Sequence, residues 1–468
     1  MAGVPPFPAG ALVTLANWQE PPYNRWAFRH LRELIPTARI SRGAGPVRRL
    51  PRVERDLTGI AFRSGERELT IGEMLAESYT DGFLVLHRGR IVTEQYFNGM
   101  TPDTPHVLMS VSKSIVSTVA GVLAGQGLLA PAAPVDRLVP ELAGTSFAGA
   151  TVQDLLDMRA GTRFDEDYAS LDADVRTYER VYLWRPDTAE PRPADALAYY
   201  PTLANDGEHG GPFRYRSILT DVLGWVLERA GGARLHELIA RLVWQPMGAE
   251  FDAEITVDAH GNAMADGGVC ATLRDIGRFG LLYAGTSRRA DARWSVVPRP
   301  WIADTVAGAA DGAAAFTAAG EDSRYPPGAH YRNCWWVSEP ALPFFHAAGI
   351  NGQNVYVHVP SQVVVAKLST WPTALHPVSR TTMDGVRAIA AALQDDRGDP
   401  AAVRLPGHGR GARLAVEVVE DAGVVLELAA DVSRERAVPE RQRAPVLVHH
   451  VEDRAAALAR GVVAEDGA

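Results

Sequence analysis

The chain has 468 residues, 46% of them hydrophobic, which is the composition of a globular protein with a large core. Its net charge is −9 and its arginines are scattered along the sequence, so nucleic acid is not expected as a partner. Two cysteines, Cys270 and Cys334, are too few for a disulfide framework, and we expect both to be reduced and buried.

The N-terminal segment does not have the pattern of a secretory signal peptide. Residues 1–17 carry no positive charge ahead of a short apolar stretch, and they contain several prolines. No uninterrupted apolar run has membrane-spanning length, so a cytoplasmic protein that does not bind membranes is expected. Residues 21–51 are rich in arginine and proline, and we expect residues 1–50 to form an irregular N-terminal arm.

The first predicted regular element after this arm is a β-hairpin. Residues 83–87 and 91–97 are rich in β-branched and aromatic side chains, and Gly89 lies in the predicted turn between them. Ser110 follows the hairpin. The apolar run after it, at residues 115–123, predicts a buried helix that begins near Ser110.

Residues from about 131 to 320 are expected to be mostly helical and rich in loops. One helix is predicted to begin after Thr151, a typical N-cap residue, and two more are predicted at residues 220–229 and 234–243. We expect this region to be inserted between the strands that precede it and those that follow it.

Strand patterns return late in the sequence, at residues 333–337, 353–359 and 363–369, and a final helix is predicted near residues 383–393. Strands at both ends with helices between them predict an α/β fold of the α+β type, in which an antiparallel sheet is flanked by helices. The main domain is expected to span residues 51–398.

The amino-acid composition and the hydrophobic pattern change after residue 398. Residues 413–419 and 423–429 have the alternation of strands, whereas the rest of the segment is dominated by arginine, alanine and glutamate. We expect residues 399–468 to be a C-terminal appendage, and the sequence assigns no role to it.

The chemistry of the chain is predicted to centre on Lys113. Among 47 basic residues only Lys113 and Lys367 are lysines, and a desolvated lysine, unlike an arginine, can lose its proton near neutral pH. Ser110 stands three positions before Lys113, a spacing with which a lysine can activate a serine nucleophile without a histidine. On a helix the two side chains would share one face, and burial would lower the pKa of Lys113. The alternative is an exposed serine–lysine pair, and no role is expected for Lys367.

Ser110 and Lys113, together with a helical middle and late strands, resemble the serine β-lactamase and penicillin-binding protein superfamily. A more specific resemblance is to the 6-aminohexanoate-dimer hydrolases, also called nylon-oligomer hydrolases. It rests on the stretches at residues 18–28, 79–86, 108–114, 166–168, 220–223, 255–258, 352–354 and 367–372. The match runs in the same order from about residue 18 to residue 395, so the tail lies outside it.

The resemblance implies that Ser110 is the acylated nucleophile and that Lys113 is its neutral base. Tyr215 matches the tyrosine that relays protons to the leaving group, although a tyrosine at such a place can also be a packing residue. Ser217 stands where the family has an asparagine, and we expect this difference to weaken one supporting hydrogen bond.

A second segment, Tyr331-Arg332-Asn333, fits the usual Tyr-x-Asn motif letter for letter. It opens a predicted strand, where a tyrosine is expected to pack in the sheet. Tyr215 is therefore preferred as the counterpart of the family tyrosine.

The third superfamily motif, Lys-Thr-Gly, is missing. Its place is taken by Ala347-Ala348-Gly349, and the resemblance implies that the backbone N–H groups of Ser110 and of the next residue, Ile350, form an oxyanion hole. The alternative is a plain glycine-containing turn. Without the lysine of that motif a β-lactam carboxylate lacks its usual anchor, which argues against a β-lactamase.

Substrate contacts are implied for four further residues. Tyr168 matches the residue that contacts the amide nitrogen of the substrate, and Glu179 falls where the family can place an acid toward the ammonium end. A lone surface glutamate is the alternative for Glu179. Asp266 stands where the family can carry a different polar residue, which leaves the preference for amides open. Asn351 is also expected to contact the substrate.

No metal or cofactor is expected, because zinc, phosphate-loop and dinucleotide motifs are missing. The predicted function is that of a serine hydrolase that forms an acyl-enzyme with small carboxylic esters or linear amides such as 6-aminohexanoate oligomers. A homodimer is compatible with this prediction. The alternatives are a penicillin-binding D-alanyl-D-alanine peptidase or β-lactamase and, from another class, a non-catalytic ligand-binding relative.

Overall fold

The computed structural model describes residues 7–186, 193–285, 293–321 and 325–394. By its internal contacts the chain divides into two units, Met1–Ala401 and Ala402–Ala468. The expected C-terminal appendage at residues 399–468 lies outside the described residues. The domain boundaries expected from the sequence therefore remain predictions.

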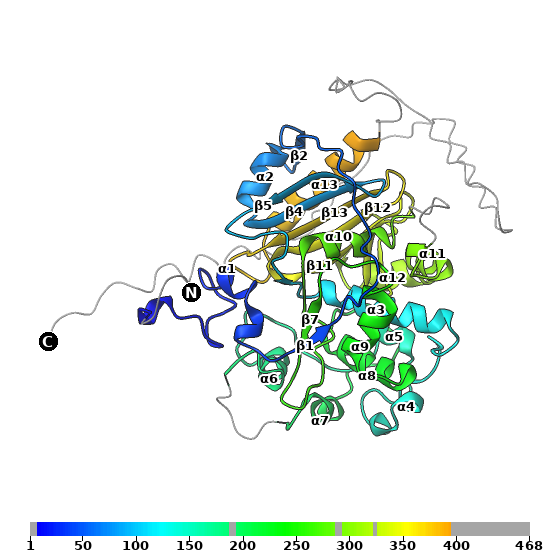
Figure 1. Ribbon diagram of the computed structural model, residues 1–468. Coiled ribbons are helices and arrows are strands. Elements are labelled where there is room, and N and C mark those ends of the chain that lie inside the picture. Colours follow the sequence, from blue (N-terminus) through cyan, green and yellow to red (C-terminus); the bar gives the residue numbers. More distant parts are fainter. Residues whose placement is uncertain (1–6, 187–192, 286–292, 322–324, 395–468) are drawn as a thin grey trace, which may run out of the picture. The chain divides into compact units, whose positions relative to one another are not determined.

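A seven-stranded antiparallel sheet forms the centre of the described unit (Figure 1). Its strands, in spatial order, are β5 (Arg90–Tyr96), β4 (Thr80–His87), β13 (Val363–Ser369), β12 (Gln353–His358), β11 (Phe344–Gly349), β10 (Trp335–Glu339) and β9 (His330–Arg332). The predicted hairpin is confirmed as β4 and β5. Its turn residues, Arg88 and Gly89, both have positive φ, 52° and 74°, as tight two-residue hairpin turns require.

Helices cover both faces of this sheet. They are α2 (Ile71–Glu77) and α13 (Val378–Gln394) on one face and α10 (Leu273–Leu281) on the other. Neighbouring residues of β4 point to opposite faces, so that Phe83 belongs to one hydrophobic core and Leu84 to the other. Glycine lets α10 lie close to the strands, because a Cβ at Gly277 would be only 2.5 Å from Leu84 Cδ2. The predicted α+β fold class is confirmed.

Two smaller sheets accompany the seven-stranded sheet in the described residues. A second sheet has the order β1 (Thr37–Ile40), β7 (Ala253–Thr256), β8 (Val269–Ala271) and β6 (His106–Val107), and a third consists of β2 (Ala61–Ser64) and β3 (Arg67–Thr70). These strands were not predicted from the sequence, because elements of two to four residues offer too few positions for an alternating pattern to be recognised. β7 and β8 also interrupt the region expected to be helical.

The segment expected to be an irregular arm is folded into the core. Trp18 and Phe28 are buried, and the indole Nε1 of Trp18 donates to the backbone oxygen of Trp184 at 2.8 Å. The short helix α1 (Asn24–Ala27) lies in this segment, and β1 pairs with β7 of the second sheet. The expectation of irregular structure is therefore wrong for this part of the chain.

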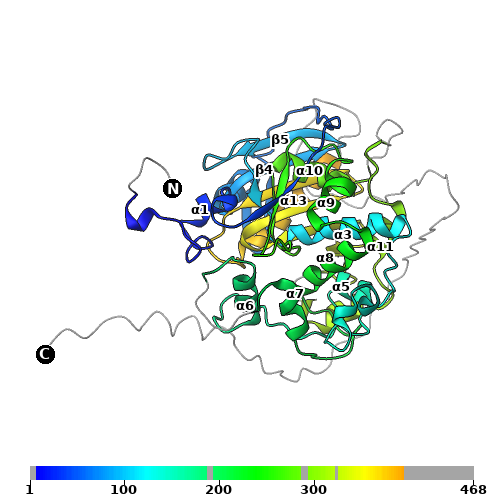
Figure 2. The same ribbon diagram turned by 60° about the horizontal axis from the view of Figure 1, so that its bottom comes forward.

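Helix α3 (Val111–Gly125) is buried along almost its whole length. Figure 2 shows it between the seven-stranded sheet and α8 (Ile218–Gly231), and it contacts both. The other helices of the described ranges are α4 (Val135–Leu138), α5 (Val152–Leu156), α6 (Asp174–Val181), α7 (Ala196–Tyr199), α9 (Leu235–Ile239), α11 (Arg299–Ala307) and α12 (Gly312–Ala318). Thr151 begins α5 with a capping box to Asp154, so this predicted helix start is confirmed.

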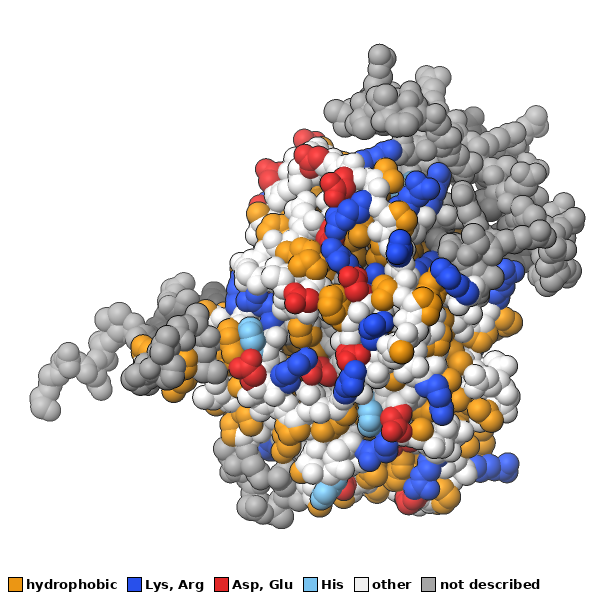
Figure 3. Space-filling model, viewed as in Figure 1, with side chains coloured by type: hydrophobic (Ala, Val, Ile, Leu, Met, Phe, Trp, Pro, Cys, Tyr) orange, Lys and Arg blue, Asp and Glu red, His pale blue; other side chains and the backbone are white. Residues whose placement is uncertain are grey.

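Surface charge and cysteine state agree with the composition. On the face shown in Figure 3, basic and acidic side chains are interspersed, and no patch of a single sign dominates. Cys270 and Cys334 are free and buried, as predicted. Within the described ranges, no helix is both long and apolar enough to pass through a bilayer.

Candidate active site

Ser110 and Lys113 meet at the beginning of α3. Ser110 is the N-cap residue, and the Nζ of Lys113 donates to its Oγ at 2.8 Å. Both are buried, with exposed fractions of 9% and 1%. The residue before Ser110, Met109, has a φ of 48°, so the chain turns sharply as it enters the helix. The predicted meeting of serine and lysine on one helix face is confirmed, and their catalytic roles remain predictions.

Ser217 gives Lys113 a second partner. The Nζ of Lys113 donates to Ser217 Oγ at 2.9 Å, so a hydrogen bond is present at this place, and whether it is weaker than that of the family's asparagine stays a prediction. Ser217 is held in turn by Glu166, whose Oε1 accepts from the Ser217 hydroxyl and whose Oε2 accepts from its backbone N–H, both at 2.6 Å. The sequence analysis did not identify this role of Glu166, because no local motif marks a carboxylate that binds a residue 51 positions away.

Asp266 is the third partner of Lys113. The Nζ donates to both the side-chain Oδ2 and the backbone oxygen of Asp266, each at 3.2 Å. Burial alone would lower the pKa of Lys113, but the Asp266 carboxylate, with smaller contributions from Tyr215 and Glu166, raises it above its ordinary value. The net pKa of Lys113 is therefore raised rather than lowered, contrary to the expectation, because the nearby acidic groups outweigh burial.

Behind this ion pair lies a second buried carboxyl group, Asp221. The hydroxyl of Tyr178 contacts both carboxyl groups, at Asp221 Oδ2 (2.8 Å) and at Asp266 Oδ1. Burial and the nearby charge of Asp266 raise the pKa of Asp221 well above its ordinary value. A protonated Asp221 can donate to the hydroxyl oxygen of Tyr178. The hydroxyl of Tyr178 can then donate its own hydrogen to Asp266.

Tyr215 lies beside Ser110 and Lys113, and it stands three positions before the start of α8. Its ring stacks on Trp336 at 5.6 Å, and Lys113 Nζ lies 5.1 Å from its ring centre. Burial raises the pKa of Tyr215 to about 12, while the charge of Lys113 and hydrogen bonding with Ser110 and Lys113 act in the opposite direction. The structure thus brings the predicted tyrosine together with the serine and the lysine.

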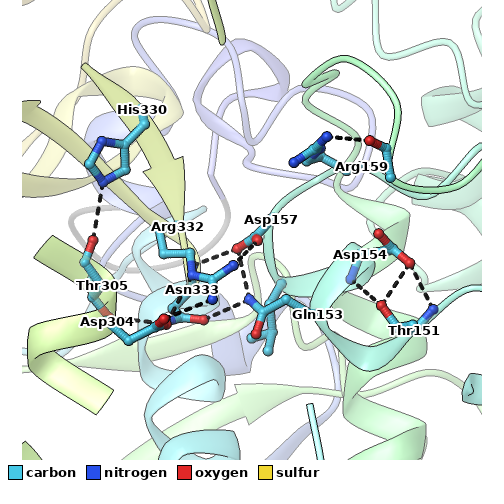
Figure 4. Close-up of polar contacts among 12 residues, drawn as sticks. Thr151, Gln153, Asp154, Asp157, Arg159, Asp304, Thr305, His330, Arg332 and Asn333 are labelled. Atoms are coloured by element: carbon cyan, nitrogen blue, oxygen red, sulfur yellow. Dashed lines mark hydrogen bonds and ion pairs between the residues drawn. The ribbon is translucent and has the colours of Figure 1, made fainter. Parts of the chain in front are cut away.

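The alternative segment, Tyr331-Arg332-Asn333, is used for packing and for a buried polar network (Figure 4). Tyr331 is buried against Phe213 and Trp336. Arg332 pairs with Asp157 at 2.6 Å and with Asp304 at 2.8 Å, and Asn333 donates to Asp304 at 2.8 Å. Because the Asn333 side chain is bound in this network, it is not the partner of Lys113, and the preference for Tyr215 stays a prediction with which this geometry is consistent.

The end of β11 lies directly against the start of α3. A Cβ at Gly349 would be 2.6 Å from the backbone oxygen of Leu108 and 3.0 Å from the backbone nitrogen of Ser110, so only glycine fits there. Ile350 follows in a short turn. The two backbone N–H groups predicted to form an oxyanion hole are thus neighbours in space, and the function of that pair remains a prediction.

The side chain of Asn351 stabilises this turn and is not among the residues that line the pocket. It has a positive φ of 57°, and its buried side chain donates to the backbone oxygen of Trp371 at 3.0 Å. Gln353, which the sequence analysis did not single out, donates to the backbone oxygens of Asn351 at 3.1 Å and Ser369 at 2.7 Å. The expected contact of the Asn351 side chain with substrate is not supported, because that side chain is occupied in holding the turn.

A pocket of about 320 Å³, open solvent included, lies in front of Ser110. It is lined by Met109, Ser110, Tyr168, Val175, Tyr178, Glu179, Trp184, Met264, Asp266, Gly267 and Ile350. The predicted substrate residues Tyr168, Glu179 and Asp266 therefore do line the same pocket as the predicted nucleophile. No group of histidine, cysteine and acidic residues suited to holding a metal ion occurs in the part of the chain that the structure describes.

Tyr168 and Glu179 are both bound within the protein. The Tyr168 hydroxyl donates to Glu166 at 2.6 Å. Glu179 accepts from Arg176 at 2.7 Å, from Arg185, and from the side-chain amide of a glutamine of the N-terminal segment at 3.2 Å. The sequence analysis missed both arginines, because nothing in their spacing shows that they converge on one carboxylate.

Comparison with known proteins agrees with this geometry. The beta-lactamase family model matches residues 78–384. A 6-aminohexanoate-dimer hydrolase of Paenarthrobacter ureafaciens is 38% identical over 367 residues, which cover 78% of this chain and 90% of the relative.

Two solved structures share the fold. A protein of Bacillus anthracis with the provisional name 6-aminohexanoate-dimer hydrolase has a TM-score of 0.74 at 24% identity and covers 84% of this chain and all of its own. EstCE1, a hydrolase with promiscuous acyltransferase activity, has a TM-score of 0.52 at 18% identity and covers 69% of this chain and 96% of its own. Because the family model spans more than half of the chain and a close relative is a hydrolase, this protein belongs to the beta-lactamase family and is a serine hydrolase.

Proposed function

We propose that this enzyme hydrolyses small carboxylic esters, and more slowly linear amides of the 6-aminohexanoate type, through an acyl-enzyme on Ser110. The observation that carries the proposal is the distance of 2.8 Å between Lys113 Nζ and Ser110 Oγ in a buried site that opens into a pocket. The 38% identity to a 6-aminohexanoate-dimer hydrolase supports the amide part of it. The cytoplasmic location and the small-molecule partners expected from the sequence remain part of this proposal.

In the proposed first step, a Lys113 side chain that has lost its own proton takes the proton of Ser110 while the serine oxygen attacks the substrate carbonyl. Because the pKa of Lys113 is raised, this neutral form is the minor one near neutral pH. The negative charge that develops on the carbonyl oxygen is stabilised by the backbone N–H groups of Ser110 and Ile350. Tyr215, whose ring centre lies 5.1 Å from Lys113 Nζ, passes the proton to the leaving group. Water then attacks the acyl-enzyme, and the same groups return the proton to Ser110. An alkoxide leaving group needs less help from this proton than an amine, so esters are the faster substrates.

The second candidate, a β-lactamase or penicillin-binding peptidase, is less well supported. β11 ends in Ala347-Ala348-Gly349, so the strand beside Ser110 offers no cation to a β-lactam carboxylate. Among the residues that line the pocket there is also no lysine or arginine. The site therefore favours substrates that need no such anchor.

A substrate panel tests the proposed function. We expect the wild-type enzyme to hydrolyse p-nitrophenyl butyrate fastest, the 6-aminohexanoate dimer slowly, and the β-lactam nitrocefin at no more than background rate. The measurement is initial rate for each substrate at equal enzyme concentration. Nitrocefin as the best substrate would replace the proposal by the β-lactamase alternative, and failure on all three substrates would favour a non-hydrolytic relative.

Asp266→Asn is expected to shift the pH dependence of kcat/KM toward lower pH. The reaction needs neutral Lys113, and the Asp266 carboxylate raises the pKa of Lys113, so the wild-type rate should rise as pH increases into the alkaline range. Without that carboxylate the pKa of Lys113 falls, so a larger fraction of Lys113 is neutral near pH 7. Asp252→Asn, at an exposed carboxylate paired with Arg39, is the control that should leave the profile unchanged. An unshifted profile in the Asp266 variant would contradict this role.

Gly349→Ala is expected to lower kcat by about a hundred- to a thousand-fold, the typical cost of losing one oxyanion donor. The added Cβ would lie 3.0 Å from the nitrogen of Ser110 and force β11 away from α3. The measurement is kcat on p-nitrophenyl butyrate, with circular dichroism to check the fold. Gly59→Ala, where no atom lies within 4 Å of the added Cβ, is the control. A Gly349→Ala enzyme with wild-type kcat would show that the proposed oxyanion hole lies elsewhere.

A further inference from the structure

Ser217 can only accept a hydrogen bond from Lys113, because its own hydroxyl hydrogen is already used. That hydrogen is donated to Glu166 Oε1 at 2.6 Å, and a serine hydroxyl has a single hydrogen to donate. The contact of 2.9 Å between Ser217 Oγ and Lys113 Nζ is therefore one in which the lysine donates. Glu166 thus sets the direction of a hydrogen bond that it does not itself make.

The direction of that bond matters once Lys113 has lost a proton, because a neutral amine has two hydrogens and one lone pair. The neighbours of Lys113 Nζ are Ser110 Oγ at 2.8 Å, Ser217 Oγ at 2.9 Å, and the backbone oxygen and Oδ2 of Asp266 at 3.2 Å each. A backbone oxygen can only accept, so Asp266 takes one hydrogen of the amine, and Ser217 takes the other. The lone pair is left for Ser110, whose proton it has to remove.

We propose that Glu166 is a positioning residue of the reaction, which turns the lone pair of neutral Lys113 toward Ser110 by making Ser217 an acceptor only. The inference rests on the proposed acyl-enzyme function, in which Lys113 is the base. Glu166 acts through Ser217 and is not among the residues that line the pocket, so it has no need to touch the substrate.

Glu166→Gln tests the proposal because it keeps the shape of the side chain and reverses one hydrogen bond. The backbone N–H of Ser217 lies 2.6 Å from Glu166 Oε2, and an amide NH2 group at that place would set two donors against each other. The glutamine oxygen is therefore expected to face this N–H, and its NH2 group to face the Ser217 hydroxyl. The hydroxyl hydrogen would then point at Lys113 and compete with Ser110 for the lone pair.

We expect Glu166→Gln to lower kcat on p-nitrophenyl butyrate by about ten- to a hundred-fold, a part of what a general base contributes. KM should change little, because Glu166 does not line the pocket. An unchanged or higher kcat in this variant would overturn the inference.

The charge that Glu166→Gln removes acts in the opposite direction. Burial lowers the pKa of Lys113, whereas Asp266, Tyr215, Glu166 and Asp221 raise it, in that order of size. Loss of the charge at Glu166 would therefore leave more neutral Lys113 near pH 7, and by itself it would speed the reaction. A lower rate thus reports the direction of the hydrogen bond and not the missing charge.

Ser217→Ala shows whether Glu166 acts through Ser217. This variant is expected to lower kcat to a similar degree, because neutral Lys113 loses one acceptor. Adding Glu166→Gln to it should cause less than about a twofold further loss, since no hydroxyl is left to turn. A full additional loss in the double variant would overturn the inference. Thermal melting checks that each variant is folded, and if Glu166→Gln does not fold, wild-type kcat in Ser217→Ala overturns the inference.

Glu73→Gln is the matched control. Glu73 accepts from the backbone N–H and the hydroxyl of Thr70 at 2.7 and 2.9 Å, as Glu166 does from Ser217, but neither residue lines the pocket. This variant should keep the wild-type kcat. Ser110→Ala separates the inference from the proposed function. If ester turnover survives in Ser110→Ala, the proposed function fails and the inference fails with it, whereas turnover that needs Ser110 but not Glu166 overturns the inference alone.

Discussion

Ser110→Ala is expected to reduce kcat on p-nitrophenyl butyrate by about a million-fold, the scale seen when a serine hydrolase loses its nucleophile. The substitution removes one oxygen from a helix start that is otherwise held by backbone bonds and packing. The N-cap position of Ser110 makes no side-chain capping bond, so the helix does not depend on this hydroxyl. The melting temperature should therefore stay close to that of the wild type while the activity disappears.

A matched control is available on the same helix. Ser114 is buried one turn later, and its hydroxyl donates to the backbone oxygen of Cys334 at 2.7 Å, away from the pocket. Ser114→Ala is expected to keep the ester activity while it costs stability, the reverse of Ser110→Ala. Equal loss of activity in both variants would mean that the helix as a whole, rather than the Ser110 hydroxyl, is what matters.

Lys113→Met is expected to reduce kcat/KM by about a hundred- to ten-thousand-fold, because Lys113 Nζ contacts the Ser110 hydroxyl directly and general bases typically contribute factors of this size. It should also lower the free energy of unfolding by about 3–5 kcal/mol, the usual cost of removing one partner of a buried ion pair. The charge that remains is that of Asp266, which lies 3.2 Å from the ammonium group. Rates and thermal melting measure the two effects separately.

The double variant Lys113→Met with Asp266→Asn separates catalysis from stability. It removes both charges, so much of the lost stability should return. The activity should not return, because the base is still missing. Recovery of activity together with stability would contradict the role of Lys113 as base, and would show that the single variant was inactive only because it was poorly folded.

The serine–lysine pair could be predicted from the sequence because it is local. Ser110 and Lys113 lie within one helical turn, and the apolar residues that follow indicate a buried helix. The β4–β5 hairpin could be predicted for the same reason, since Gly89 and its flanking strands are neighbours in the chain. Tyr215 required the family resemblance, because a tyrosine before a helix has no chemical signature of its own.

The state of the site could not be predicted, because it depends on contacts between residues that are distant in sequence. The rise in the pKa of Lys113 comes from Asp266, a residue 153 positions later. Ser217 keeps its bond to Lys113 because Glu166 holds it from another loop. Arg176 and Arg185 likewise pair with Glu179, and nothing in their spacing along the sequence predicts these ion pairs. The sequence could therefore predict which residues meet at the site, whereas the pKa of Lys113 depends on a tertiary contact with Asp266.

The most direct test of the account is to trap the acyl-enzyme. The wild-type protein is mixed with excess p-nitrophenyl butyrate, quenched with acid within the first turnovers, and analysed by intact mass and peptide mapping. We predict an added butyryl group on the peptide that contains Ser110, and no addition in Ser110→Ala. A butyryl group on another residue, or ester hydrolysis that continues in Ser110→Ala, would contradict the account.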